Sequence, residues 1–269
     1  MQSDLEVAKQ GLSKNGFLKL NFDPTIDLFD EIEKLKRQKK AIVLAHYYQE
    51  SDIQDVADFV GDSLALSQKA AETDAEIIVF AGVQFMAETA KILSPNKKVL
   101  LPDLNAGCSL SDSCLPEDFY EFKKKNPDHL VVTYVNCSAE IKGMTDIVCT
   151  STNAVQIIES IPKEQKIIFG PDKNLGAYVK KKTGRDLLLW DGACMVHEIF
   201  SLDKIKIILQ ENSGAELIAH PECEAELLEE ATYVGSTAGL LKYCQKSNTD
   251  TFVVATESGI IYQMQKACP

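Results

Sequence analysis

Residues 41–48 read AIVLAHYY, a short apolar run that ends in a histidine and two tyrosines. Two later stretches repeat this pattern, LVVTYVN at residues 130–136 and LIAHPE at residues 217–222. Short aliphatic runs that alternate with amphipathic helical stretches are typical of parallel sheets with helical crossovers. The sequence therefore predicts an α/β fold in which one type of strand occurs three times.

A weak internal repeat, with a period of roughly 70–90 residues, connects these stretches. In our alignment the second strand of each unit ends in FAGV (80–83), CTSTNA (149–154) and VGSTAG (234–239). The third strand ends in LPD (101–103), FGPD (169–172) and ATE (255–257). We therefore predict three α/β units at residues 25–108, 109–190 and 191–269, the last one incomplete at its C-terminal end.

Polar, hydroxyl or ionisable residues end most of these strands. In open parallel sheets ligands bind at the carboxyl ends of the strands, because the following helices point their N-terminal amides into the same crevice. Three units that face one another would enclose a single polar cavity. The alternative is that short α/β segments look alike and that polar strand ends are ordinary loop residues.

The elements of the first unit can be placed in more detail. A helix is predicted over Ile26–Lys39, with an apolar stripe and a basic end that complements the helix dipole. The strand Ala41–Ala45 follows it directly. A second helix is predicted from Ser51, a suitable N-cap, to Gly61 as its stop.

The composition excludes several classes of function. The chain has 40 acidic against 28 basic residues, and its formal charge of −12 argues against binding to nucleic acid or to an anionic membrane. The N-terminal residues show no secretory signal, and the longest apolar runs are too short to cross a bilayer. We expect a soluble cytoplasmic protein whose eight cysteines are free thiols or metal ligands rather than disulfides.

Candidate acid–base groups follow two of the repeated first strands. His46 precedes a pair of tyrosines that includes Tyr48, and His220 precedes Pro221 and Glu222. Imidazole has an ordinary pKa near 6.5, which permits proton transfer as well as binding of carboxylate or phosphate. A histidine at a strand end can equally be a structural residue.

Three hydroxyl residues stand beside small residues at the predicted starts of helices: Ser63, Ser151 and Thr237. A hydroxyl together with the free N–H groups of a helix start can hold a phosphate or a carboxylate. Each one can also be a simple N-cap. Their recurrence in successive units favours the binding role.

The cysteines carry none of the usual metal signatures, since the sequence contains no C-x-x-C pair. Cys108 in NAGCSLSDSC and Cys194 in WDGACMVHE stand in turns rich in glycine and alanine. Such turns allow the backbone to approach an inorganic cluster. Buried, inert thiols are the alternative reading of the same pattern.

A series of motifs, taken together and in order from residue 41 to the C-terminus, resembles the quinolinate synthase family. The motifs are AHYYQ (45–49), GDSLALS (61–67), AGCSLSDSC (106–114), TYVNCSAEIK (133–142), CTSTNA (149–154), FGPDKNLG (169–176), WDGACMVHE (190–198), HPEC (220–223), VGSTAG (234–239) and ATESGI (255–260).

The resemblance implies three related αβα units with small parallel sheets around a pseudo-threefold axis, and an active site at the central junction. It implies a [4Fe-4S] cluster held by one cysteine from each unit, with Cys108 and Cys194 matching the first two ligands and the fourth iron open as a Lewis acid. The implied reaction condenses iminoaspartate with dihydroxyacetone phosphate to quinolinate, for NAD biosynthesis. An aspartate oxidase or dehydrogenase is the implied source of iminoaspartate.

The resemblance also implies a set of site residues, carried over position by position. The implied catalytic residues are Tyr48, Glu222 and His46. The implied substrate-contacting residues are His46, Ser63, Tyr134, Val135, Asn136, Ser151, His220, Pro221, Glu222 and Thr237.

The third cluster cysteine of the family is expected near the C-terminus, beyond the segment that matches TESGIIYQMQK at residues 256–266. Cys268 lies short of that place, so we do not assign it as a ligand. We expect the third thiolate to come from a tail that follows Pro269, and the protein without that tail to hold no cluster. The alternative is that Cys268 enters the cavity as a substitute ligand.

Two other functions are compatible with an α/β chain of this kind. A zinc-dependent aldolase or isomerase acting on a triose phosphate would give a colourless protein, whereas a cluster gives a brown protein that air bleaches. A non-catalytic solute-binding protein would normally need an export signal.

Overall fold

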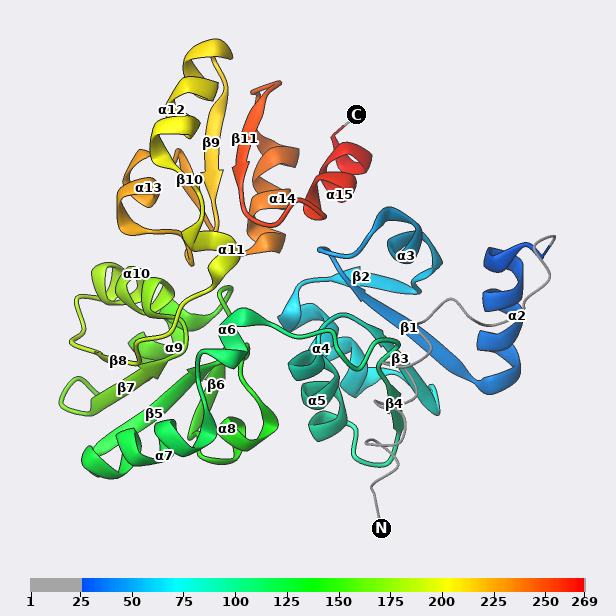
Figure 1. Ribbon diagram of the computed structural model, residues 1–269, viewed down its shortest axis with the longest axis horizontal. Helices are drawn as coiled ribbons and strands as arrows, with labels where there is room; N and C mark the ends of the chain where they lie inside the picture. The colour runs from blue at the N-terminus through cyan, green and yellow to red at the C-terminus, as the bar shows by residue number, and fades with distance from the viewer. Residues whose placement is uncertain (1–25, 269) are drawn as a thin grey trace.

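The computed structural model describes residues 26–268, which form three small sheets with helices packed around them (Figure 1). The first unit contains α2 (Leu28–Lys39), β1 (Ala41–His46), α3 (Ser51–Val56), β2 (Phe59–Gly61), α4 (Ser63–Glu72), β3 (Ile77–Ala81), α5 (Gln84–Leu93) and β4 (Lys98–Leu100). The second contains α6 (Ser109–Asp112), α7 (Pro116–Lys125), β5 (His129–Tyr134), α8 (Ala139–Gly143), β6 (Ile147–Cys149), α9 (Ala154–Ser160), β7 (Lys166–Gly170), α10 (Lys173–Thr183) and β8 (Leu188–Leu189). The third contains α11 (Met195–Glu198), α12 (Leu202–Glu211), β9 (Glu216–Ala219), α13 (Ala225–Glu230), β10 (Tyr233–Val234), α14 (Thr237–Lys246), β11 (Phe252–Ala255) and α15 (Ile260–Ala267).

The three sheets share one strand order. It is β2-β1-β3-β4 in the first sheet, β6-β5-β7-β8 in the second and β10-β9-β11 in the third, and every pairing is parallel. In Figure 1 the three lobes surround a common centre, toward which β1, β5 and β9 run. The predicted fold class, α/β with three related units, is confirmed.

The predicted alignment of strands is correct for β1, β5 and β9 and wrong for the rest of the first unit. The strand order makes β2 the counterpart of β6 and β10, so that FAGV belongs to β3 and aligns with β7 and β11. The helix predicted from Ser51 to Gly61 stops at Val56. Ala57 is extended, and the Asp58 carboxylate accepts a hydrogen bond of 2.7 Å from Val43 N, which ties the next segment to β1 as a strand.

The same tie recurs in the second unit, where the Asp146 carboxylate accepts a hydrogen bond of 2.8 Å from Val131 N just before β6. In all three units the residue before the short strand donates its backbone N–H to a carbonyl of the central strand. These donors are Asp58, Asp146 and Thr232. This shared connection supports the internal repeat independently of the strand order.

The first helix departs from its prediction at one end and on one face. It begins at Leu28 because the Asp27 side chain caps it by accepting from Phe29 N and Asp30 N. Its predicted apolar stripe is largely exposed within the described part of the chain, with Phe29 45% and Leu35 50% accessible. No helix among the described residues is long and apolar enough to span a membrane.

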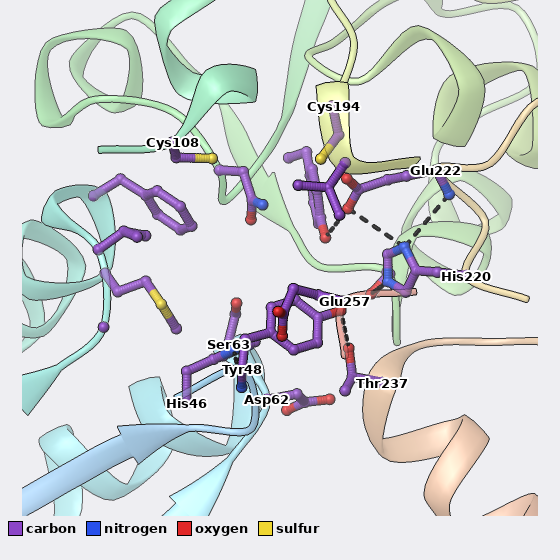
Figure 2. Close-up of a pocket in the computed structure, with 18 of the residues that line it drawn as sticks. His46, Tyr48, Asp62, Ser63, Cys108, Cys194, His220, Glu222, Thr237 and Glu257 are labelled. Carbon is purple, nitrogen blue, oxygen red and sulfur yellow. Dashed lines mark hydrogen bonds and ion pairs between the residues drawn. The ribbon is translucent and has the colours of Figure 1, made fainter. Parts of the chain in front are cut away.

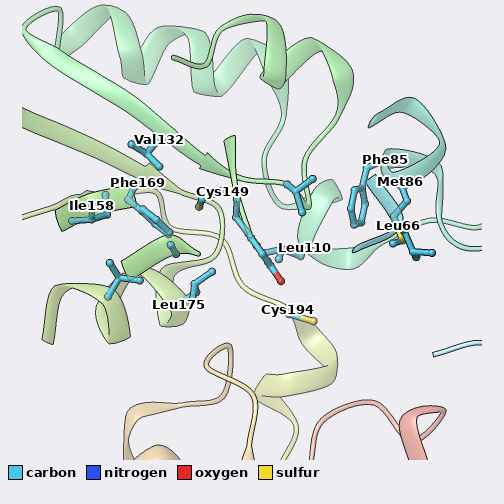
Figure 3. Close-up of a cluster of buried hydrophobic side chains, with 14 of the residues drawn as sticks. Leu66, Phe85, Met86, Leu110, Val132, Cys149, Ile158, Phe169, Leu175 and Cys194 are labelled. Atoms are coloured by element: carbon cyan, nitrogen blue, oxygen red, sulfur yellow. The ribbon is translucent and has the colours of Figure 1, made fainter. Parts of the chain in front are cut away.

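The hydrophobic core is continuous between the first two units and separate in the third. One buried cluster joins Leu66 and Met86 of the first unit, through Leu110, to Val132 and Phe169 of the second (Figure 3). The third unit has two clusters of its own on the two faces of its sheet. One of these also receives the tyrosine pair that follows β1, and so packs the third unit against the first.

Gly259 sets how closely the first and third units approach. A Cβ at this position would lie 2.7 Å from the Cα and carbonyl carbon of Tyr48, which is shorter than any tolerated contact with backbone. The Gln54 side-chain amide strengthens the same junction by donating to the carbonyl of Gly259 at 3.1 Å and to that of Gln49 at 2.7 Å.

We therefore expect Gly259→Ala to lower the free energy of unfolding by about 1–3 kcal/mol, because the backbone around Tyr48 must move to relieve the clash. Gly143→Ala is the matched control, since a Cβ at Gly143 meets nothing within 4 Å. Urea denaturation of both variants measures the difference. Equal stability of the two would show that the junction accommodates the methyl group.

Candidate active site

A cavity of about 440 Å³ lies where the three units meet (Figure 2). Side chains from the ends of β1, β5 and β9 and from the starts of α4 and α14 contribute to its wall. Most of the residues predicted from the sequence line it: His46, Tyr48, Ser63, Cys108, Tyr134, Asn136, Ser151, Cys194, His220, Glu222 and Thr237. The other two, Val135 and Pro221, are buried beside the lining without being part of it.

The histidines at the ends of β1 and β9 have the same local geometry. The Nδ1 of His46 accepts a hydrogen bond of 3.2 Å from Tyr48 N, and the Nδ1 of His220 accepts one of 3.4 Å from Glu222 N. An Nδ1 that accepts leaves the proton on Nε2. The Nε2 of His220 lies 3.2 Å from the Ser151 hydroxyl. Both imidazoles can therefore act as N–H donors toward a ligand.

Burial keeps both of these imidazoles neutral at neutral pH. Desolvation, only partly opposed by the charge of Glu222, lowers the pKa of His46 to about 4. The same cause lowers the pKa of His220 to about 3. A neutral donor can bind a carboxylate or a phosphate without carrying a fixed positive charge into the cavity.

Glu222 is the central carboxylate of the site and is 2% exposed. It accepts a hydrogen bond of 2.7 Å from the Tyr134 hydroxyl and lies 3.2 Å from His197 Nδ1. Burial alone would raise its pKa, but the neighbouring imidazoles of His197 and His220 and the Tyr134 hydroxyl outweigh burial and lower the pKa to about 2. Glu222 is therefore an ionised acceptor.

Tyr48, unlike Glu222, keeps its proton at neutral pH. Its hydroxyl lies 2.8 Å from the hydroxyls of both Thr237 and Thr256, and its ring packs edge-on against His46 at a centroid distance of 4.3 Å. Burial raises the pKa of Tyr48 well above its ordinary value, although the two threonine hydrogen bonds act to lower it. The site thus combines a protonated phenol with an ionised carboxylate.

Three residues that precede helices of the three units are joined by hydrogen bonds. Thr152 Oγ1 lies 3.1 Å from Asp62 Oδ2 and 2.9 Å from Ser236 Oγ. Asp62 is the N-cap of α4 and Ser236 is the N-cap of α14. We call these three residues the cap group. Each is a sequence neighbour of one predicted hydroxyl residue: Ser63, Ser151 or Thr237.

Cys108 and Cys194 lie on the side of the cavity opposite His46 and Ser63 (Figure 2). The loops that carry the two thiols are tied together, because Met195 N donates to the Ser109 hydroxyl at 3.3 Å. Cys194 N also donates to the buried Asp172 carboxylate at 2.9 Å. Two soft sulfur donors at one wall fit an iron–sulfur cluster in ligand type.

A second combination of ligands shares Cys194. The Sγ of Cys194, a ring nitrogen of His197 and a carboxylate oxygen of Glu222 all lie within 4.8 Å of one another and are buried. These three residues, which we call the Cys-His-Glu group, can hold a metal ion.

Sequence reasoning missed Asp62, Thr256 and Glu257 as site residues, and it considered His197, which follows a cysteine-bearing segment, without assigning it to the site. His197 had a signal that was not used, the C-x-x-H spacing from Cys194. Glu257 lines the cavity and stands in the ATE motif directly after β11. Asp62 and Thr256 act through hydrogen bonds to residues of other units, Thr152 and Tyr48, which the sequence alone does not show.

A comparison with known families identifies the family of the chain. The family described as NadA, Quinolinate synthetase A protein, matches residues 30–269 of the chain. The chain belongs to the quinolinate synthetase A family. Its members are enzymes, and the match covers all three sheets of the structure.

Individual members of the quinolinate synthetase A family are similar to this chain over most of their length. The chain is 65% identical to the quinolinate synthase of Gloeothece citriformis over 243 residues, which are 90% of this chain and 75% of that one. It is 64% identical to that of Nostoc sp. over 91% of this chain and 75% of the relative, and 61% identical to that of Chloroherpeton thalassium over 91% and 76%. A solved structure, the E-1-hydroxy-2-methyl-but-2-enyl-4-diphosphate reductase from Plasmodium falciparum, aligns at 14% identity over 88% of this chain and 80% of that one, with a TM-score of only 0.32.

Proposed function

We propose that the chain is a quinolinate synthase of NAD biosynthesis, which condenses iminoaspartate with dihydroxyacetone phosphate and releases phosphate and water. One observation carries this proposal: the residues matched to the family from separate parts of the sequence line one cavity at the junction of the units. An enzyme that supplies iminoaspartate, an aspartate oxidase or dehydrogenase, is the proposed functional partner.

Anion binding is the first task of such a site, because both substrates are negatively charged. The N–H donors of His46 and His220 and the hydroxyls of Ser63 and Thr237 are the proposed partners of the carboxylate and phosphate groups. The starts of α4 and α14 add the partial positive charge of a helix N-terminus. Neutral donors of this kind let an acidic chain bind anions.

Proton transfer is the second task, since carbon–carbon bond formation, imine closure and loss of water each move a proton. We assign the removal of a proton from carbon to the Glu222 carboxylate. We assign proton donation to a leaving oxygen to the Tyr48 hydroxyl. The Tyr134 hydroxyl, which donates to Glu222 at 2.7 Å, holds that carboxylate in place.

Cys108 and Cys194 would hold a [4Fe-4S] cluster at the wall facing these groups. When bound, a cluster with an open iron supplies a Lewis acid for a substrate oxygen or nitrogen, and the condensation needs no net electron transfer. The origin of the third thiolate stays a prediction. Cys268 is exposed at the end of α15 and does not line the cavity in the described part of the chain.

The proposal is tested by purifying the protein without oxygen, counting iron and sulfide, and assaying quinolinate formation. Iminoaspartate is generated in the assay by an aspartate oxidase, and dihydroxyacetone phosphate is added. We expect quinolinate to form only in the iron-loaded protein, and air to abolish both the visible absorption and the activity. Activity that follows zinc content instead would support an aldolase-type enzyme.

The cap group gives a test of substrate positioning. We expect Thr152→Val to raise the KM for the substrates about fivefold with little effect on kcat. Thr152 holds Asp62 and Ser236, the neighbours of the proposed substrate partners Ser63 and Thr237, and a lost hydrogen bond is worth about 1 kcal/mol. Thr183→Val is the control, since the hydroxyl of Thr183 lies at the end of α10, away from the cavity, where it donates to the Val179 carbonyl at 2.8 Å and accepts from Arg185 N at 3.3 Å. Equal KM values for the two variants would argue against a positioning role.

A further inference from the structure

The Cys-His-Glu group has the geometry of a metal site that does not need Cys108. Cys194 and His197 are three residues apart at the start of α11, so their side chains project from the same side of one helical turn. Glu222 approaches from the loop after β9 and is 2% exposed. All three residues line the central cavity.

The state of His197 points to a missing partner. The residue is 3% exposed, yet its Nδ1 makes no hydrogen bond in the described chain. The Glu222 carboxylate lies 3.2 Å from this nitrogen, without the alignment of a hydrogen bond. A buried ring nitrogen without a hydrogen bond is uncommon, and an Nδ1 that carries no proton, beside the Glu222 carboxylate and close to the Cys194 thiol, is suited to bind a cation.

The outer contacts of the group match those of metal ligands. The other ring nitrogen of His197, Nε2, lies 3.0 Å from the Thr256 hydroxyl, which can accept its proton and so leave Nδ1 free to bind. The Tyr134 hydroxyl donates to one oxygen of Glu222 and orients the second toward His197. Ligands that are oriented by such hydrogen bonds are typical of built metal sites.

We propose that the cluster-free protein binds one zinc-type divalent ion through Cys194 Sγ, His197 Nδ1 and a carboxylate oxygen of Glu222. Thiolate, imidazole and carboxylate are the ligands of zinc, whereas calcium and magnesium select oxygen donors only. The charges of one thiolate and one carboxylate balance a divalent ion. Three protein ligands leave a fourth position that faces the cavity.

This ion site goes beyond the proposed function and excludes the cluster, because both use Cys194. The zinc site itself does not depend on the proposed function. Only the competition between zinc and the cluster for Cys194 rests on the cluster assignment. Zinc bound before the cluster is assembled would occupy a ligand of the cluster and block its assembly. The zinc content of the isolated protein would then be a measure of failed cluster assembly rather than of a zinc-dependent activity.

The test titrates metal-free protein with Zn²⁺ against a chromophoric chelator under anaerobic conditions. We expect one ion per chain, and a loss of affinity of more than about 100-fold in His197→Ala, since ligand loss exceeds the 10- to 100-fold effect of a supporting residue. Thr256→Val should weaken binding about 10- to 100-fold, because only the contact to Nε2 is removed. Cys108→Ala should bind Zn²⁺ as the unaltered protein does.

Two results would overturn the proposal: no binding of Zn²⁺ to the unaltered protein, or binding that depends on Cys108 and not on His197. Circular dichroism checks that each variant is folded. If His197→Ala does not fold, the affinity of Thr256→Val for Zn²⁺ decides the test. These measurements need no quinolinate assay, so they succeed or fail independently of the proposed function.

Competition is measured by adding iron and sulfide to the protein with and without prior loading with Zn²⁺. We expect the loaded protein to take up less than about a tenth of the iron, and a chelator to restore uptake, as follows from a shared ligand that must be released first. Full iron uptake in the presence of bound zinc would contradict the shared role of Cys194.

Discussion

In protein that assembles the cluster, the Cys108→Ala variant is expected to fold and to lose both its iron and its ability to form quinolinate. A cluster is held by thiolates, and the loss of one of the two thiols at the wall of the cavity leaves too few ligands to retain it. Cys108 is partly exposed toward the cavity, so its replacement removes little packing. Cys194→Ala should have the same effect.

Cys244→Ala provides the matched control. Cys244 is buried in α14 and packs into the core of the third unit without lining the cavity. We expect this variant, like those of Cys114, Cys137, Cys149 and Cys223, to retain iron. Iron and sulfide analysis after anaerobic reconstitution, together with the quinolinate assay, compares them. Full iron content and turnover in Cys108→Ala would refute the assignment of this thiol.

The strand ends were predictable from sequence because the residues change there from apolar to polar while the chain stays buried. In β1 the buried apolar residues Val43 to Ala45 are followed by His46, which is also buried. The apolar runs of β5 and β9 likewise lead into the buried residues Tyr134 and His220. An apolar run that stops at an ionisable residue is visible without any knowledge of packing. The recurrence of this pattern then indicates that the three ends share a location.

The misplaced parts of the prediction have physical causes of a different kind. β2 has only three residues and is fixed by the side chain of Asp58, so it has no hydrophobic period of its own. Local propensity favoured a helix that continues beyond Val56. Instead, the hydrogen bond from Val43 N to the Asp58 side chain holds the following residues beside β1 as a strand. Asp146 stands in the same place before β6, and comparing the two aspartates would have revealed the strand.

The inner contacts of the site could not be predicted because they join distant segments. Thr256 meets Tyr48 across 208 positions of sequence, and Asp172 reaches Cys194 N from the end of a different strand. No local period encodes such contacts. The resemblance to a family identified residues that face the cavity, whereas the residues that orient them from behind became visible only in the structure.

The variants Tyr48→Phe and Glu222→Gln are expected to keep the cluster and lose about two to four powers of ten in kcat, as is typical for a positioned acid or base. This loss corresponds to about 3–5 kcal/mol of transition-state stabilisation. Each substitution preserves shape and removes one function. The glutamine amide oxygen would still accept the hydrogen bond from Tyr134. The phenylalanine ring would still pack against His46, because only the phenol hydroxyl is gone.

The neighbouring residue Tyr47 supplies the control for this experiment. Its ring packs beside the third unit, and its hydroxyl makes no hydrogen bond among the described residues. We therefore expect Tyr47→Phe to turn over normally. Iron content is measured first in every variant, so that a lost cluster is not mistaken for a lost proton donor. Rapid mixing of loaded enzyme with both substrates then gives kcat and KM separately. A raised KM with unchanged kcat in both variants would mean that Tyr48 and Glu222 bind the substrate without transferring protons, because a group that acts only in the transition state lowers kcat.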